Sequence, residues 1–327
     1  MSQYTATAIA RANIALAKYW GKSDVALNLP AVPSISITLE PMRTETTVRF
    51  DEALREDQLV LAGESIQGKP LTRAIKVLDQ VRTLAKLPLK ARIDTANNFP
   101  TASGLASSAS GFAALVAASW TAAGLARDNA RWSAMSRQAS ASAARSIYGG
   151  FVELPRGVPG DASVAAKVIA PPSHWDVRIV VAVATEEAKA VGSTEGMTLS
   201  EQTSPYYRSW VDCSDALTAQ VREGILEKNL TKVGEAMEQS TLAMHACMMA
   251  SRPGLIYFQP VTLAAFATVK KLRKAGVEVY ATMDAGPHVK ALCHAADAEK
   301  VAAAFADTPL VVRTLIAHPG ADLEIRS

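Results

Sequence analysis

The chain has 327 residues, of which 49% are hydrophobic and 20% are charged, a composition typical of a globular protein with room for one large core or two smaller ones. Its net charge is only +3 and it contains no basic block, so the sequence does not support nucleic-acid binding. No apolar run approaches the ~18 residues that span a bilayer, the N-terminus lacks a leader pattern, and the three cysteines are too far apart for a disulfide framework or zinc site. We therefore expect a cytoplasmic protein that does not associate with membranes.

Hydrophobic periodicity predicts strands and helices in an irregular order. The predicted strands are 4–16, 34–50, 177–183, 277–283 and 310–316, and the predicted helices are 70–84, 105–124, 128–146, 205–228, 230–249, 261–274 and 296–306. The connection 18–33 is polar and contains proline. No regular βαβ period and no internal repeat is present, so we predict an α+β fold with a lobe boundary around 170–190.

The segment from Asn97 to Ala109 is rich in small and hydroxyl residues and leads into an apolar-periodic helix. The first backbone N–H groups of a helix lack internal partners and attract anions. The segment is therefore a candidate phosphate-binding loop, with Ser107 and Ser108 as possible hydroxyl or metal ligands. The simpler interpretation, which is the more common one for an isolated turn of this kind, is a serine-capped helix at the surface.

A second phosphate-loop pattern is rejected. Gly63 to Lys69 fits the first seven positions of a Walker A motif, but Pro70 stands where Ser or Thr should bind magnesium. Proline has neither a hydroxyl nor an N–H for a phosphate. The two flanking glycines fit a hairpin better.

Three further groups of residues are candidates, each with a simpler alternative. Lys18-Tyr19-Trp20-Gly21-Lys22 places two amines and a phenol in a loop, although a solvated basic turn with Trp20 in the core is the favoured interpretation of this segment taken alone. Ser140, Ser142 and Arg145 sit near the end of the predicted helix 128–146, where an arginine commonly complements the helix dipole. Asp284 follows a predicted strand and precedes Gly-Pro, where Asp often forms an Asx turn.

Taken together, these segments resemble the diphosphomevalonate decarboxylases of the GHMP small-molecule kinase superfamily. The resemblance rests on segments in the family's order, namely 13–22, 27–30, 34–36, 97–109, 141–150, 193–197, 244–246 and 283–287. Two departures are Ala141, where many relatives carry Gly, and Gly192, where many carry Ser. The resemblance implies a two-lobed GHMP kinase fold, with a ribosomal protein S5 domain 2-like lobe over 1–180, a ferredoxin-like lobe over 181–327, and the active site between them.

The resemblance also implies an activity: the ATP- and magnesium-dependent conversion of mevalonate 5-diphosphate to isopentenyl diphosphate, ADP, phosphate and CO2. By resemblance, Asp284 orients or deprotonates the 3-hydroxyl and Lys18 neutralises the transferring phosphoryl group. Arg145, with Ser142, holds the carboxylate that leaves as CO2. The family further suggests a homodimer.

The resemblance extends to binding residues. Those carried over for the substrate are Tyr19, Lys22, Ser140, Ser142, Arg145 and Ser193. Those carried over for ATP are Asn97, Pro100, Ser103, Gly104, Leu105, Ala106, Ser107, Ser108 and Lys189. Ser107 is also the expected magnesium ligand.

Two alternatives remain within the enzyme class: a decarboxylase that accepts the monophosphate, and a relative that phosphorylates mevalonate at C3 without decarboxylation. The presence of Asp284, Lys18 and Arg145 favours complete decarboxylation over the second. A silent nucleotide sensor is a different class of protein, and it would be expected to show a damaged acid or phosphate loop, which this sequence does not have.

Overall fold

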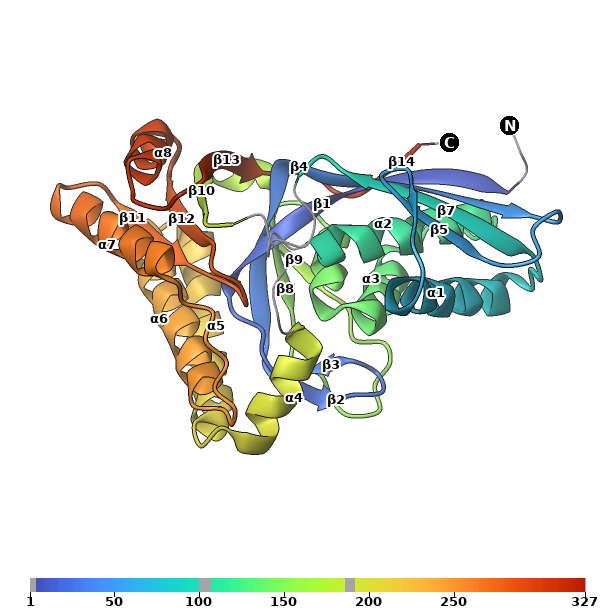
Figure 1. Cartoon of the computed structure of the whole chain (residues 1–327), viewed down its shortest axis with the longest axis horizontal. Helices are drawn as coiled ribbons and strands as arrows, with labels where there is room; N and C mark the ends of the chain where they lie inside the picture. The colour runs from blue at the N-terminus through green and yellow to red at the C-terminus, as the bar shows by residue number, and fades with distance from the viewer. Residues whose placement is uncertain (1–3, 100–106, 186–191, 327) are drawn as a thin grey trace.

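A computed structural model of the chain describes residues 4–99, 107–185 and 192–326, with α-helices and strands mixed along the sequence (Figure 1). Six of the predicted site residues, Pro100, Ser103, Gly104, Leu105, Ala106 and Lys189, lie outside the described residues. Ser107 is described only as the first residue of a helix. The predicted binding contacts of these residues therefore stay predictions.

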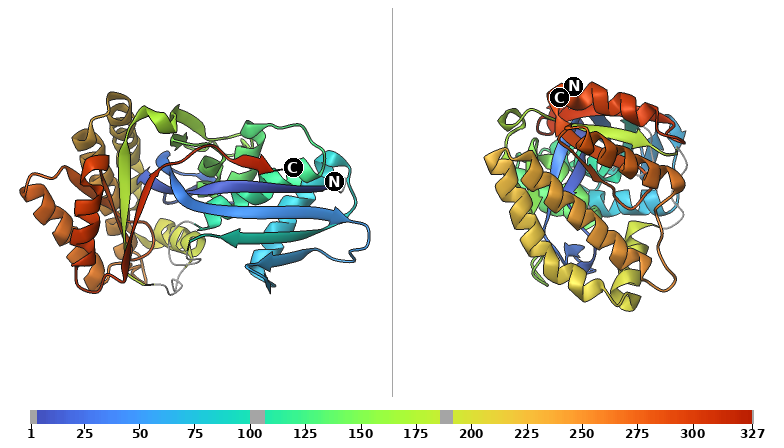
Figure 2. Two further views of the ribbon diagram at one scale, coloured as in Figure 1. Left: turned by 90° about the horizontal axis from the view of Figure 1, so that it is seen from above. Right: turned by 90° about the vertical axis from the view of Figure 1, so that its left-hand side faces the viewer.

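Twelve strands of the described chain form one continuous sheet, and helices pack against it in two separate groups (Figures 1 and 2). The strands are β1 Thr5–Ala17, β4 Ser34–Asp51, β5 Gln58–Leu61, β6 Glu64–Ser65, β7 Lys90–Asn97, β8 Phe151–Leu154, β9 Lys167–Ala170, β10 Val177–Val183, β11 Val279–Thr282, β12 Val289–His294, β13 Arg313–Pro319 and β14 Glu324–Arg326. A separate hairpin joins β2 Lys22–Asp24 to β3 Leu29–Pro30.

The helices are α1 Lys69–Ala85, α2 Ser107–Ala122, α3 Asn129–Ala139, α4 Ser193–Thr203, α5 Tyr207–Glu227, α6 Leu230–Met249, α7 Pro260–Lys274 and α8 Ala298–Ala306, with short 3-10 turns η1 Ala141–Ile147, η2 Pro172–His174 and η3 Ala295–Asp297. Most predicted elements are confirmed within a few residues. The predicted strand 310–316 begins late, at Arg313, because Leu310 has a left-handed backbone with φ 68°.

In the N-terminal half, α1, α2 and α3 pack on the sheet of β1, β4 and β7 (Figure 1). Alternate residues of β4 and β7, such as Val48 and Ile93, point into this core. The opposite side chains, such as Arg49 and Arg92, lie on the other face of the sheet. This alternation is what a sheet with one covered face requires.

In the C-terminal half, helices cover both faces of the sheet. In β10, Val177, Ile179 and Val181 pack toward α5 and α6. Their neighbours Val180 and Ala182 pack toward α7 and α8 on the other face. The prediction that 177–183 is a strand buried on both faces is therefore confirmed. The proposed boundary at 180 stays a prediction.

The prediction of one helix over 128–146 is wrong. Asp128 caps the helix as expected, accepting a hydrogen bond from the N–H of Arg131 at 3.0 Å. The helix ends at Ala139, Ser140 is extended with φ −157°, and η1 follows. Serine competes with the helical backbone and weakens a helix, while the packing of Ala141 and Ala144 against β8 selects the tighter turn.

The rejected Walker-like segment is a hairpin followed by a helix start. Ala62 and Gly63, both with positive φ, form the turn between β5 and β6. Gly68 precedes α1, which begins at Lys69. The hairpin interpretation is confirmed.

Candidate active site

The ends of two distant strands bring a lysine and an aspartate together. Lys18 directly follows β1, and its Nζ donates to Asp284 Oδ1 at 2.7 Å and to the carbonyl of Ala15 at 2.9 Å. Its backbone N–H donates to Ser240 Oγ on α6 at 3.0 Å. The lysine side chain is 1% exposed, whereas the aspartate is 29% exposed. A buried ammonium thus holds a carboxylate that remains open on one side.

The segment after β11 sets the position of Asp284. The N–H of Gly286 donates to the Asp284 carbonyl at 2.8 Å, which closes a tight turn directly after the aspartate. The second carboxylate oxygen, Oδ2, accepts from Lys290 Nζ of β12 at 3.0 Å. Burial opposes ionisation of Asp284, but the charges of Lys18 and Lys290 outweigh it and hold the Asp284 pKa well below its usual range.

Arg145 supplies a further buried cation. Its Nη1 donates to Ser34 Oγ at 2.7 Å and its Nε to Ser36 Oγ at 2.9 Å. Nη2 lies 3.4 Å from Asn13 Oδ1. Among the described residues no carboxylate forms an ion pair with it, and burial lowers its pKa to about 10. Neutral partners therefore orient the guanidinium and leave its charge for a ligand.

The two serines near Arg145 do not bond to it directly. Ser142 contributes its carbonyl, which accepts from Asn13 Nδ2 at 3.0 Å, and its hydroxyl lies 3.3 Å from that of Ser140. Asn13 thereby links the η1 backbone to Arg145. The predicted helix face is replaced by a 3-10 turn, in which residues three apart also stack on one side.

The loop after β1 combines a core tryptophan with a polar group that is available to a ligand. Trp20 fills the core, as the simpler interpretation predicts, and its Nε1 donates to Ser200 Oγ of α4 at 3.0 Å. The Tyr19 hydroxyl, in contrast, is buried without a hydrogen-bond partner among the described residues. Burial raises the pKa of Tyr19, so its hydroxyl stays protonated and can donate a hydrogen bond to a bound ligand.

Lys22 and Arg73 form a second cationic group, and sequence reasoning missed Arg73. Burial, together with the charge of Arg73, lowers the pKa of Lys22. The Arg73 guanidinium lies 4.4 Å from the centre of the Phe112 ring and donates to the Ala139 carbonyl at 2.7 Å. Within the described chain neither cation has a carboxylate partner, so the pair suits an anion.

Helix α4, which the sequence did not reveal, begins at Ser193. Its Gly196 packs against Trp20, where an added Cβ would lie 3.0 Å from the indole ring. This close approach, together with the hydrogen bond from Trp20 to Ser200, holds α4 against the loop between β1 and β2. The N-terminal N–H groups of a helix favour an anion.

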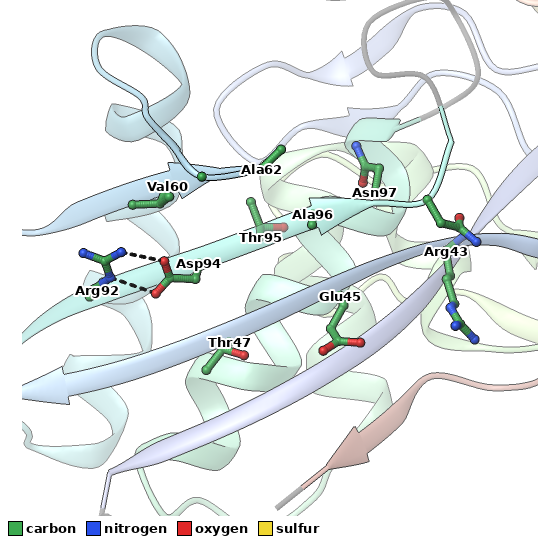
Figure 3. A pocket seen from close by; sticks show the side chains of 12 residues that line it. Arg43, Glu45, Thr47, Val60, Ala62, Arg92, Asp94, Thr95, Ala96 and Asn97 are labelled. Atoms are coloured by element: carbon green, nitrogen blue, oxygen red, sulfur yellow. Dashed lines mark hydrogen bonds and ion pairs between the residues drawn. The ribbon is translucent and has the colours of Figure 1, made fainter.

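Asn97 lies apart from this centre, at the end of β7. It lines a cavity of about 620 Å³ with Arg43, Glu45 and Asp94 (Figure 3). Its Oδ1 accepts from Thr44 at 2.5 Å. The cavity contains neither Lys18 nor Asp284, so it is separate from the buried ionic centre.

Lys290 is the most important residue that sequence reasoning missed. It lies inside the apolar strand Val-Lys-Ala-Leu-Cys. A lysine in such a run could have indicated a buried ion pair, because lysines are seldom buried without a partner. In the structure its side chain is 1% exposed and paired with Asp284.

The fold and this centre define a class of protein. Two helix-covered lobes on a mixed sheet, with Lys18 and Asp284 paired between them, fit the two-lobed fold of the GHMP small-molecule kinases. Residues 10–165 match the family model for the diphosphomevalonate decarboxylase-like N-terminal domain, and residues 179–313 match that for the mevalonate 5-diphosphate decarboxylase C-terminal domain. The chain belongs to the diphosphomevalonate decarboxylase family.

Individual relatives agree with this assignment. A diphosphomevalonate decarboxylase of Ganoderma lucidum is 36% identical over 88% of this chain and 78% of its own length. The mevalonate diphosphate decarboxylase of Staphylococcus aureus matches with a TM-score of 0.93 and 37% identity, covering 99% of this chain and 98% of that one. A structure of MDDEF in complex with MVAPP, AMPPCP and magnesium matches with a TM-score of 0.92 and 34% identity over 99% of both chains.

Proposed function

We propose that this chain uses ATP to phosphorylate the 3-hydroxyl of mevalonate 5-diphosphate and then decarboxylates the product to isopentenyl diphosphate, releasing ADP, phosphate and CO2. The observation that carries the proposal is the buried centre in which Lys18, Asp284 and Arg145 converge. It offers one carboxylate for a hydroxyl and unneutralised positive charge for anionic groups.

The first step needs a hydroxyl held in line with the γ-phosphoryl group. Asp284 accepts a hydrogen bond from the 3-hydroxyl and takes its proton as the new O–P bond forms and the bond to ADP breaks. The low pKa of Asp284 keeps it ionised but makes it a weak base, which suits a loose transition state governed by positioning and charge. Lys18, beside it, stabilises the transferring phosphoryl group.

The second step breaks two bonds. The C3–O bond breaks with its electron pair leaving on phosphate, and the bond to the carboxylate then breaks, so that its electrons form the double bond and CO2 departs. Arg145 holds the carboxylate in line through its planar guanidinium. Its orientation by Ser34 and Ser36 before substrate arrives supports this role.

The diphosphate lies toward Tyr19, Lys22 and Ser193. The Tyr19 hydroxyl, which has no hydrogen-bond partner among the described residues, and the cationic pair of Lys22 and Arg73 support this placement, as does the start of α4 at Ser193. The hydroxyls of Ser140 and Ser142 line the approach to Arg145. The alternative monophosphate substrate would leave part of this positive charge unused.

ATP is the phosphoryl donor, and its phosphates lie at the start of α2, where Ser107 and Ser108 stand. The cavity beside Asn97, at the end of β7, supports the placement of the nucleoside there. Magnesium prefers oxygen ligands and would be held by Ser107 and the phosphates, where it neutralises phosphate charge. The excess of buried cations over carboxylates in the centre fits a polyanionic co-substrate.

We also propose that the chain works as a homodimer in the cytoplasm. No helix among the described residues has the length and apolarity to cross a bilayer. Light scattering on the purified full chain tests the dimer, and a monomer mass at working concentration would contradict it.

The function is tested by incubating the chain with ATP, magnesium and either mevalonate phosphate or diphosphate, following CO2 and ADP together. The proposal expects equal amounts of both with the diphosphate. ADP without CO2 would identify the C3 kinase, and CO2 from the monophosphate alone would identify the other decarboxylase. The absence of both ADP and CO2 would overturn the proposed activity.

A further inference from the structure

Asp284 is shared between two buried lysines, only one of which has a role in the proposed reaction. Lys290 lies in β12 opposite Val181 of β10 and Thr282 of β11, in the interior of the C-terminal sheet. Its side chain is 1% exposed, and Asp284 is its hydrogen-bonding partner in the described chain. An ammonium this deeply buried is costly unless its partner stays ionised.

The two lysines hold opposite oxygens of one carboxylate. Lys18 contacts Oδ1 at 2.7 Å and Lys290 contacts Oδ2 at 3.0 Å. A carboxylate with one partner can rotate about its last torsion, which is broad and soft. Two partners on different segments, one directly after β1 and one in β12, fix the plane of the group and therefore the direction of Oδ1.

The other charged groups around Asp284 do not replace Lys290. Arg145 interacts with Asp284 only at longer range, without an ion pair. Burial lowers the pKa of His245 to about 4, with the charge of Lys18 adding to the effect. Burial also lowers the pKa of His288 to about 3, with help from Lys290. Both imidazoles are neutral near pH 7, so among the described residues only Lys18 and Lys290 neutralise the aspartate directly.

We propose that Lys290 is a positioning residue that acts through Asp284: it fixes Oδ2, so that Oδ1 and Lys18 stay directed at the reacting hydroxyl. When Lys18 shares its charge with the incoming phosphoryl group, Lys290 keeps Asp284 ionised and in place. The consequence for catalysis rests on the proposed function, whereas the fixed carboxylate is a property of the ligand-free chain.

The test compares Lys290→Met, Lys290→Gln and Lys290→Arg with Lys300→Met, which removes an exposed lysine of α8. Met fills a similar volume without charge. Removing one member of a buried ion pair lowers stability, but Asp284 keeps Lys18 as a partner in this variant. Gln provides a second neutral variant if Met disturbs folding. Melting temperature is measured for all four variants.

Two readouts separate positioning from a structural role. Carbon-13 NMR of labelled aspartates follows the titration of the Asp284 carboxyl in ligand-free protein, and kcat and KM are measured from about pH 5 to pH 8. We expect the neutral variants to raise the Asp284 pKa and to lower kcat about 10- to 100-fold across this pH range with little change in KM, as for outer groups that orient reactive ligands. Lys290→Arg should restore most of kcat, and Lys300→Met should match the wild type.

The outcomes distinguish this inference from the proposed function. If both neutral variants keep the wild-type titration and pH profile and change only the melting temperature, Lys290 is structural and the inference is overturned. If the titration shifts as expected but wild-type protein releases no CO2 from any mevalonate phosphate, the proposed function fails while the role of Lys290 in fixing Asp284 stands.

Discussion

The ammonium of Lys18 and the carboxylate of Asp284 lie 2.7 Å apart although 266 positions separate them in sequence. The first follows β1 and the second follows β11, so the ion pair joins the two helix-covered halves of the sheet. Because the lysine is buried and the aspartate is partly open, a substrate hydroxyl can reach the carboxylate while water has little access to the ammonium.

Substitution of Asp284 should reduce the activity much more than it reduces nucleotide binding. We expect Asp284→Asn, and equally Asp284→Ala, to lower kcat about 10²- to 10⁴-fold, because the acceptor for the hydroxyl proton is lost. Nucleotide binding, measured by calorimetry, should remain close to that of the wild type. A variant that keeps most of its kcat would remove Asp284 from the reaction.

Arginine at 145 should be needed for its shape as well as its charge. In Arg145→Lys the planar fork is lost, and the contacts with Ser34 and Ser36 cannot both form. We expect CO2 release to fall by orders of magnitude while ADP formation falls less, so that the ratio of CO2 to ADP drops below one. An unchanged ratio at wild-type rate would contradict the carboxylate-holding role.

Removing the Tyr19 hydroxyl should affect substrate binding and not stability. Tyr19→Phe deletes a buried hydroxyl that has no partner in the described structure, so the melting temperature should stay the same or rise. The KM for the diphosphate should rise by about tenfold, the effect of one lost hydrogen bond to a charged group. A lower melting temperature with unchanged KM would show that the hydroxyl serves the fold.

Activity should fall as the pH rises through about 8. Burial lowers the pKa of Lys18 to about 8, against the opposing charge of Asp284, and the proposed role of Lys18 needs its protonated form. The pH profile of kcat/KM measures this limb. In Lys18→Arg, whose guanidinium stays charged, the limb should disappear even if the rate is lower, and its persistence would assign it to another group.

The same group predicts how stability varies with pH. In the unfolded chain Lys18 has the ordinary lysine pKa of 10.5, above the folded value of about 8. Between these values the unfolded state binds more protons, so the contribution of Lys18 to the free energy of unfolding rises with pH. Urea titrations of wild type and Lys18→Met across this window measure the difference between the two proteins. A difference that stays constant with pH would show that folding does not lower the pKa of Lys18.

Packing behind the centre should be sensitive at one glycine. Gly234 of α6 lies against the ring of Tyr280, and an added Cβ would overlap the ring. We expect Gly234→Ala to lower the free energy of unfolding by about 1–3 kcal/mol. Gly111→Ala in α2 is the matched control, since nothing lies within 4 Å of the added Cβ, and it should stabilise by about 0.5–1 kcal/mol. Equal effects at the two sites would contradict the packing argument.

The sequence by itself determined the local elements with strong periodicity and the residue types of the centre. Helices such as α5, α6 and α7 carry regular apolar faces, and β10 is an apolar run bounded by polar residues. Such signals depend on a few neighbouring residues and are readable without the fold. Short segments such as α4 and β12 carry weaker patterns, and the break at Ser140 depends on packing that lies outside the local sequence.

Only the tertiary structure decided which groups face one another. Motif resemblance marked Lys18, Arg145 and Asp284 as candidates, but their distances, the orientation of Arg145 by Ser34 and Ser36, and the second lysine on Asp284 follow from strand register and helix packing. The physical reason is that burial and charge act through space. A lysine has the same chemistry in any sequence. Lys290 becomes part of this centre only because β12 lies between β10 and β11 and the Lys290 ammonium pairs with Asp284.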